Sequence, residues 1–543
     1  MRATVNFNNK NISVLYAPKF FSSFAYYGLL SLLMLFFIHT LKLSQVESYV
    51  LIGSFVGVSM IAALVSGFIS SQYLSSSLCC LLGFVGYLIG SFLLIKYQDM
   101  FYVYLGLSFV AGGYGLFEPN AQILFGAGFH ESSHSKRNIG FIILYLFNII
   151  GQFFGPIVLT YLNIIDPRYL FIGTGLSSLV GLIYIACNFR KMRALEFSQD
   201  QLINVKKHSF FRTCVAAFLL VILIYVPVQS VSTGFFSSFN AMIILPFVVA
   251  IFWMVRKFLR FDKDVEMPVA FEKNKNIVFG TLAVGMLFVL SFFTISGSQV
   301  KSLFVMLFIP IAIFLAVTLW REKNEVRHGI ISLFLLFVAT LFSEVCLRVC
   351  FGIIDIFTKN FVDRNLLGWH IDTAIFESAE PFFILLFFVG VIWAIKYFSN
   401  RQNPLSYGAL MSFGLLMFSA CFASLVAGIS LAQGSAISMG WLLLCYLLMA
   451  IGELCTIPIA FSAVTGLSPR NWQGGVMGIL YMTGGLGAYF SSEIGKFITP
   501  IVGIPTLETY QNLFFHWMSY TALSALLLYF VWNWLNKGSA SAI

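Results

Sequence analysis

Segments of about 20 consecutive apolar residues recur along almost the whole chain, and this repetition limits what the chain can fold into. Of its 543 residues, 59% are hydrophobic and only 10% are charged. A helix needs roughly 20 apolar residues to cross the hydrocarbon core of a bilayer. Only helices and closed barrels satisfy their backbone hydrogen bonds there. The pattern therefore predicts an all-α protein that crosses a membrane many times.

The apolar pattern predicts 16 membrane spans in three groups. The longest polar connections, 190–209 and 257–276, lie on either side of 210–256. They indicate an N-terminal six-helix bundle at 1–195, an inserted region of four spans at 196–325, and a C-terminal six-helix bundle at 326–543. The predicted spans are 14–42, 48–72, 75–96, 101–126, 138–163, 168–189, 210–231, 236–256, 277–297, 302–320, 329–356, 373–397, 405–430, 436–465, 473–500 and 511–536.

Lysine and arginine are distributed unevenly between alternate loops. If the N-terminus is cytoplasmic, 22 of them fall on the cytoplasmic side, six on the outer side and four in or near spans. This is the asymmetry that the positive-inside rule describes. It predicts that both termini face the cytoplasm. It also accounts for the net charge of +10 without a nucleic-acid partner.

The stretch Gly112–Asn120, G-G-Y-G-L-F-E-P-N, interrupts an otherwise apolar run. Its glycines allow a neighbouring helix to approach closely. Pro119 leaves one backbone carbonyl without its helical partner. Glu118 is a carboxylate far from either end of the span, and such residues mark pathways, partners or ligands because a charge in hydrocarbon costs about 2.5–3.5 kcal/mol. The stretch predicts a kinked, tightly packed helix that faces a functional site.

The sequence gives little support for a metal, a cofactor or an enzyme. His130–His134 matches H-E-x-x-H, but a zinc protease needs that motif on a helix together with a third ligand. Here it lies in a predicted loop. All nine cysteines lie in apolar spans and are predicted to be buried hydrophobic residues, not a disulfide framework.

Five stretches resemble one transporter family. In the first span, Phe24, Tyr26, Tyr27 and Gly28 resemble the end of E-x-x-E-R-F-x-Y-Y-G. The other four are Gly113–Asn120 (G-x-G-L-x-K-P-N), Phe141 to Gly151 (F-x-x-x-Y-x-x-N-x-G), Phe361–Arg364 with Phe376–Pro381 (N-V-D-R and F-Q-x-L-N-P), and Gly452–Leu454 through Pro469 (G-E-L and the residues after it). The chain resembles the proton-dependent oligopeptide transporters of the major facilitator superfamily, in particular the bacterial dipeptide and tripeptide permeases.

The resemblance implies a major facilitator fold with extra helices between its two bundles. It implies a proton-coupled symporter of small peptides that works by alternating access as a monomer. The membrane would be the bacterial inner membrane. Substrate in such folds binds between the bundles near the bilayer midplane. Another amphoteric or anionic metabolite as substrate, or a non-transporting sensor or scaffold on the same fold, remains an alternative.

Several charged positions depart from the family pattern. Where the family has E-x-x-E-R, this chain reads Lys19-Phe20-Phe21-Ser22-Ser23. The family's helix 4 lysine is Glu118 here, and asparagines of its helices 7 and 8 are Asp355 and Glu380, in the predicted spans 329–356 and 373–397. Both signs are reversed at Lys19 and Glu118, which predicts an ion pair with exchanged partners.

The resemblance and the departures together give a set of candidate site residues. The resemblance assigns the ammonium group of a bound peptide to Glu453 and Glu380. Ser23 cannot replace the bidentate fork of an arginine, so Lys19 and Arg348 are the candidates for a carboxylate. Tyr26, Tyr27 and Asn148 complete the predicted substrate site.

Proton coupling is predicted at Glu118, Glu380, Glu453 or Asp355, with Glu453 favoured. Structural explanations also remain open for several candidates: an Arg348–Asp355 ion pair, an interfacial Lys19, packed tyrosines, and a helix–helix hydrogen bond at Asn148.

The charge distribution predicts which side of the membrane each terminus occupies. We expect single cysteines at residues 5 and 540 to resist a membrane-impermeant thiol reagent in intact cells, whereas one at residue 99, in a predicted outer loop, reacts. Labelling of either terminal cysteine from outside would overturn the topology.

Overall fold

The computed structural model describes residues 9–197 and 324–537, with short gaps inside these ranges. The gaps are at 44, 73, 130–133, 367–368, 372–375, 377–378, 400–404, 433–435, 469–472 and 499–505. The four spans predicted at 210–320 lie outside the described residues. The boundaries predicted for the inserted region therefore stay a prediction.

The first described part folds into six helices, as the apolar spans predict. A short 3-10 helix, η1 (Asn9–Leu15), precedes them, and a π-helical turn, η2 (Phe36–Thr40), extends the first. The helices are α1 (Tyr16–Leu35), α2 (Gln45–Gln72), α3 (Ser76–Leu94), α4 (Met100–Ala127), α5 (His134–Ile165) and α6 (Pro167–Phe197).

The second described part also folds into six long helices, joined at one end by two pairs of very short strands. The helices are α12 (Asn324–Phe361), α14 (Ala379–Ser399), α15 (Tyr407–Ala432), α16 (Met439–Leu467), α17 (Gln473–Ile498) and α18 (Leu507–Lys537). Strand β1 (Val362–Asp363) pairs in parallel with β4 (Ile437–Ser438), and β2 (Asn365–Leu366) pairs antiparallel with β3 (Trp369–His370).

The outer surface of these helices is apolar, as expected of a protein surrounded by lipid. In the described part of the chain, ten helices are long and apolar enough to cross a membrane. Large side chains such as Ile164, Trp393 and Trp534 are more than 60% exposed. Cys187 on α6 is also exposed, so the prediction that every cysteine is buried was wrong there. The chain is an all-helical, multi-pass membrane protein.

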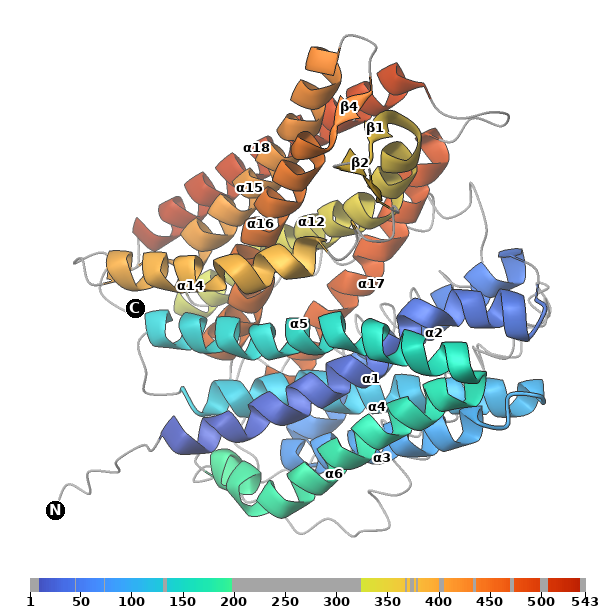
Figure 1. The fold of residues 1–543 in the computed structure, drawn as a ribbon. Helices are drawn as coiled ribbons and strands as arrows, with labels where there is room; N and C mark the ends of the chain where they lie inside the picture. The colour runs from blue at the N-terminus through green and yellow to red at the C-terminus, as the bar shows by residue number, and fades with distance from the viewer. Residues whose placement is uncertain are drawn as a thin grey trace, which may run out of the picture.

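The two bundles meet mainly along three helices of the first and three of the second. Figure 1 shows the N-terminal bundle in blue to green and the C-terminal bundle in yellow to red, with α5 and α14 lying side by side at the boundary. Helix α2 packs against α17, α5 against α14 and α16, α4 against α16 and α17, and α12 packs on α17 within its own bundle. Helices far apart in sequence therefore surround one central region.

The glycine-rich centre of α4 packs as its sequence predicts. A Cβ atom added to Gly113 would lie 2.6 Å from the carbonyl oxygen of Gly83 on α3, so only glycine fits at this approach. Pro119 cannot donate to the carbonyl of Gly115 one turn earlier. The hydroxyl of Ser66 on α2 donates to that carbonyl instead. Close packing and a replaced hydrogen bond thus hold Glu118 in a defined position at the bundle interface.

Gly113→Ala tests the close approach of α3 and α4. We expect it to destabilise the protein by about 1–3 kcal/mol, because backbone atoms must move to admit the methyl group. Gly390→Ala on α14 is the matched control, since nothing lies within 4 Å of a Cβ there. Thermal unfolding in detergent should show a lower midpoint for Gly113→Ala alone. Equal midpoints would contradict the packing argument.

Candidate functional site

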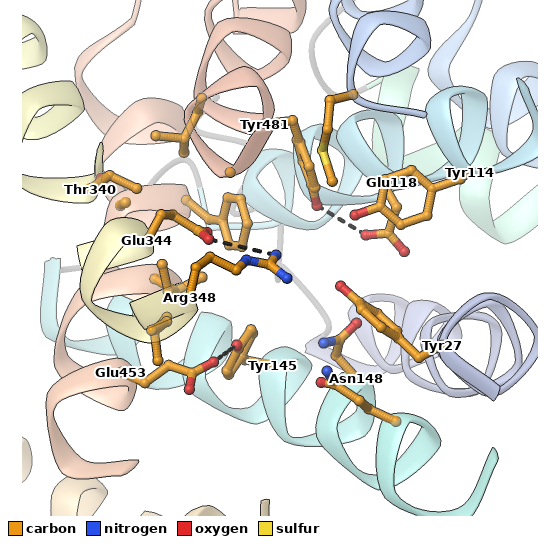
Figure 2. A pocket seen from close by; sticks show the side chains of 18 of the residues that line it. Tyr27, Tyr114, Glu118, Tyr145, Asn148, Thr340, Glu344, Arg348, Glu453 and Tyr481 are labelled. Carbon is orange, nitrogen blue, oxygen red and sulfur yellow. Dashed lines mark hydrogen bonds and ion pairs between the residues drawn. The ribbon is translucent and has the colours of Figure 1, made fainter. Parts of the chain in front are cut away.

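A charged cavity of about 120 Å³ lies between the two bundles. Figure 2 shows its lining side chains converging from both halves of the chain. The described residues that line it are Lys19 and Tyr27 on α1, Met60 on α2, Tyr114 and Glu118 on α4, Tyr145, Asn148 and Gln152 on α5, Thr340, Glu344, Leu347 and Arg348 on α12, Glu380 on α14, Glu453, Ile457, Ala460 and Phe461 on α16, and Leu480, Tyr481 and Gly484 on α17.

Glu118 accepts hydrogen bonds from three side chains on two other helices. The Lys19 ammonium on α1 forms an ion pair with its Oε2. The hydroxyl of Ser22 donates to Oε1 at 3.2 Å, and the hydroxyl of Tyr481 on α17 donates to Oε2 at 3.0 Å. Lys19 and Glu118 are only 3% and 2% exposed, so Lys19 is not an interfacial lysine. The ion pair predicted from the two sign reversals is present, and it also contacts the other bundle.

Glu453 carries an unsatisfied oxygen in the opposite wall of the cavity. The hydroxyl of Tyr145 on α5 donates to its Oε1. Its Oε2 is buried and has no hydrogen-bond partner among the described residues. A buried carboxylate oxygen without a donor is costly, by about 1–3 kcal/mol or more for a charged group. This oxygen is therefore ready to accept a hydrogen bond from a bound cationic group or to take up a proton.

Arg348 pairs with an acid that sequence reasoning did not select. Its Nη2 lies 3.9 Å from Oε2 of Glu344, one helical turn earlier on α12. The two side chains are 38% and 18% exposed, so the guanidinium is the more accessible group. Figure 2 shows it extending toward the centre of the cavity. Asp355, the predicted partner, lies on the same helix, but its side chain is outside what the structure describes.

The remaining predicted residues divide between the cavity and the packed interior. Tyr27, Asn148 and Glu380 line the cavity. The hydroxyl of Ser23 on α1 donates a hydrogen bond to Oδ1 of Asn148 on α5. Ser23 is not among the residues that line the cavity. Tyr26 is 1% exposed, and its ring centroid lies 4.1 Å from that of Tyr114, so it packs within the bundle.

Sequence reasoning missed three of the cavity residues that matter most: Glu344, Tyr114 and Tyr481. Glu344 could have been found, because an acid four residues before an arginine within one apolar span forms a pair on one helix face. Tyr481 had no local signal, since its partners are more than 350 residues away in the chain. His130 to Ser133 of the H-E-x-x-H match lie outside the described residues, and His134 instead contacts the Tyr407 hydroxyl at 3.0 Å.

Comparison with known proteins finds a matching family model and several related proteins. Residues 297–512 match the model of the POT family. Dipeptide and tripeptide permease B of Aliivibrio fischeri is 23% identical over 532 residues, which are 93% of each chain. Dipeptide and tripeptide permease A of Yersinia pestis is 22% identical over 536 residues, covering 96% of this chain and 91% of that protein. The chain thus contains a POT family domain over residues 297–512.

Solved structures of POT peptide transporters share the fold of this chain. A peptide transporter POT in complex with sulfate superimposes with a TM-score of 0.63 at 17% identity and covers 99% of this chain and 96% of the other. A POT family transporter in complex with a thioalcohol-conjugated peptide has a TM-score of 0.62 at 17% identity, with 97% and 96% covered. The recognition from short motifs and the predicted fold class are confirmed.

The buried Lys19–Glu118 ion pair can be tested by a double-mutant cycle. Lys19→Ala or Glu118→Ala should each destabilise the protein by about 3–5 kcal/mol, because either leaves one buried charge alone. The exchanged variant, Lys19→Glu with Glu118→Lys, should recover much of the loss. Thermal stability and uptake are the readouts.

Lys191→Ala is the control for this cycle. Lys191 is an exposed lysine on α6 that donates to Asn188 one turn earlier, so its loss should change stability by less than about 0.5 kcal/mol. A coupling energy near zero between Lys19 and Glu118 would show that the pair does not contribute as its burial implies.

Proposed function

We propose that this chain is a secondary active transporter of small peptides that works by alternating access. The observation that carries the proposal is a charged cavity enclosed between two six-helix bundles, with an accessible guanidinium on one wall and an incompletely satisfied carboxylate on another. The related proteins named dipeptide and tripeptide permeases support peptides as the substrate class. We further propose proton coupling, a monomer, the bacterial inner membrane, and cytoplasmic termini.

The two ends of a peptide are matched by two different groups in this cavity. The Glu453 carboxylate, through its free Oε2, is the proposed partner of the peptide ammonium. Arg348 is the proposed partner of the peptide carboxylate, because its guanidinium presents several donors in a planar fork. Lys19 is engaged by Glu118 and Ser23 by Asn148, so neither is the first choice for that carboxylate. Arg348 on α12 thus takes the place of the arginine that the first helix lacks.

Two hydrogen bonds between the bundles, each from a tyrosine of one bundle to a glutamate of the other, support a way in which transport is gated. Tyr481 on α17 donates to Glu118 on α4, and Tyr145 on α5 donates to Glu453 on α16. In each case the acid lies on the fourth helix of one bundle and the tyrosine on the fifth helix of the other. Rocking of the bundles must break both bonds. Protonation of either carboxylate weakens its bond, because hydrogen bonds to ionised acceptors are the stronger ones.

Glu453→Gln tests this coupling in proteoliposomes. Glutamine keeps a hydrogen-bond acceptor but cannot take up the proton. We expect uptake of a labelled dipeptide driven by a pH gradient to fall to near background, while counterflow exchange stays measurable. Glu508→Gln is the matched control, since Glu508 is an exposed acid at the start of α18. Gradient-driven uptake that survives in Glu453→Gln would rule out Glu453 as the proton site and direct attention to Glu118.

A second substrate class is favoured by one comparison. A POT family transporter with a TM-score of 0.62 and 18% identity was crystallised with 5-aminolevulinic acid, an amphoteric metabolite. The same pair of groups, Arg348 and Glu453, suits any small molecule with a carboxylate and an ammonium. A dipeptide library that gives no uptake, beside uptake of such a metabolite, would favour this alternative. A sensor or scaffold would show neither.

A further inference from the structure

Two glycines on α17 lie opposite the same acid of α12 but leave different amounts of room beside it. Gly484 and Gly487 are three residues apart, so they share one face of α17. A Cβ atom added to Gly487 would lie 2.6 Å from the Cβ atom of Glu344, so the two helices touch there. A Cβ atom added to Gly484 would lie 3.5 Å from the nearest atom of Glu344, which is an ordinary contact. Helix packing therefore requires glycine at position 487 but not at position 484.

The room at Gly484 lies in front of the Glu344 carboxylate and belongs to the cavity. Gly484, Glu344 and Thr340 all line the cavity, and we call the space between them the Gly484 niche. The two carboxylate oxygens of Glu344 would lie 3.5 and 3.6 Å from a Cβ atom at Gly484. The absent side chain thus gives a ligand in the cavity access to both oxygens. Figure 2 shows Thr340, Glu344 and Arg348 on the same helix.

The Glu344 carboxylate can accept hydrogen bonds from a ligand. In the described part of the chain its ion-pair partner is Arg348, with 3.9 Å between Nη2 and Oε2. That distance is an ionic contact and is too long for a hydrogen bond. The side chain of Glu344 is 18% exposed although it lies between the bundles. An ionised carboxylate accepts several hydrogen bonds on its two oxygens, so it has acceptor capacity that faces the cavity.

The spacing of Glu344 and Arg348 fits the last residue of a peptide. The two side chains are one helical turn apart, which is about 6 Å along the helix axis. Arg348 is the proposed partner of the peptide carboxylate, and a single residue can reach from that carboxylate to Glu344 with its side chain. A bound carboxylate also draws the guanidinium toward the ligand. Glu344 then favours a donor from the ligand, because an acceptor left without one in a buried site is unfavourable.

We infer that the Gly484 niche is a subsite for the side chain of the C-terminal residue of a peptide, and that it favours side chains with a hydroxyl or amide donor. Glu344 is the acceptor. Gly484 determines the specificity, because its lack of a side chain opens the way to Glu344. An acidic side chain is repelled by the same carboxylate. This inference rests on the proposed function, since it states which peptides the same cavity takes.

The test is competition for uptake of labelled Ala-Ala into proteoliposomes under a fixed pH gradient. The unlabelled competitors are two pairs of similar shape, Ala-Gln with Ala-Met and Ala-Thr with Ala-Val. We expect Ala-Gln and Ala-Thr to compete at concentrations about tenfold lower than their partners, a factor that corresponds to about 1.4 kcal/mol. Ala-Glu should be the weakest competitor. The reversed dipeptides, Gln-Ala and Met-Ala, should show no such preference, because their side chain lies on the other residue.

Gly484→Ala closes the niche without a clash, because the added methyl group makes only ordinary contacts. We expect it to remove the preference for the donor within each pair. Gly390→Ala on α14 is the matched control, since nothing lies within 4 Å of a Cβ atom there, and it should keep the preference. Each preference is a ratio measured within one variant, so it does not depend on how much protein folds. Glu344→Gln removes the charge at almost the same size and should relieve the discrimination against Ala-Glu.

The outcomes separate this inference from the proposed function. Equal competition within the pairs, or a donor preference that survives Gly484→Ala, overturns the inference and leaves peptide transport standing. An equal donor preference in the reversed dipeptides also overturns it, because the niche would then not be specific for the C-terminal residue. Uptake of labelled Ala-Ala verifies peptide transport independently. Failure of every dipeptide to enter or compete overturns both.

Discussion

The structure depends on how its buried ionisable groups are compensated in a protein surrounded by hydrocarbon. Glu118 is compensated by donors from α1 and α17, and its position is held by glycine packing at Gly113 and by Ser66, which replaces the donor that Pro119 removes. Removing a partner would leave a buried charge alone, which is far more costly than removing the pair. The same carboxylate therefore stabilises the N-terminal bundle and connects it to the other bundle.

A second carboxylate, Glu453, is arranged differently although it occupies the corresponding helix of the other bundle. It has a tyrosine from the opposite bundle, as Glu118 has, but no neighbouring cation that the structure shows to be bonded to it. One of the two acids is thus neutralised internally, and the other keeps an oxygen available. Glu118 therefore holds the two bundles together, whereas Glu453 keeps an oxygen available for binding. In other respects the two tyrosine–carboxylate hydrogen bonds between the bundles correspond to each other.

The arrangement also shows how a transporter fold tolerates exchanged charges. Lys19 and Glu118 reverse the signs expected at both positions, and the pair persists because an ion pair depends on complementarity and proximity, not on which helix carries which sign. The lost arginine of the first helix has no such local replacement. Arg348 reaches the cavity from α12, on the other bundle.

The amino-acid sequence by itself determined the helices, their number in each described bundle, and the resemblance to the POT family. These follow from the length of apolar runs and from short motifs, which act locally along the chain. It also indicated the Lys19–Glu118 pair, because both residues departed from one pattern together. Tertiary structure alone decided that Tyr481 joins Glu118, that Glu344 is the close partner of Arg348, and that Tyr26 packs inside while Tyr27 lines the cavity. Neighbouring residues on a helix point in different directions, and partners hundreds of residues apart are set by helix packing, so no local pattern contains that information.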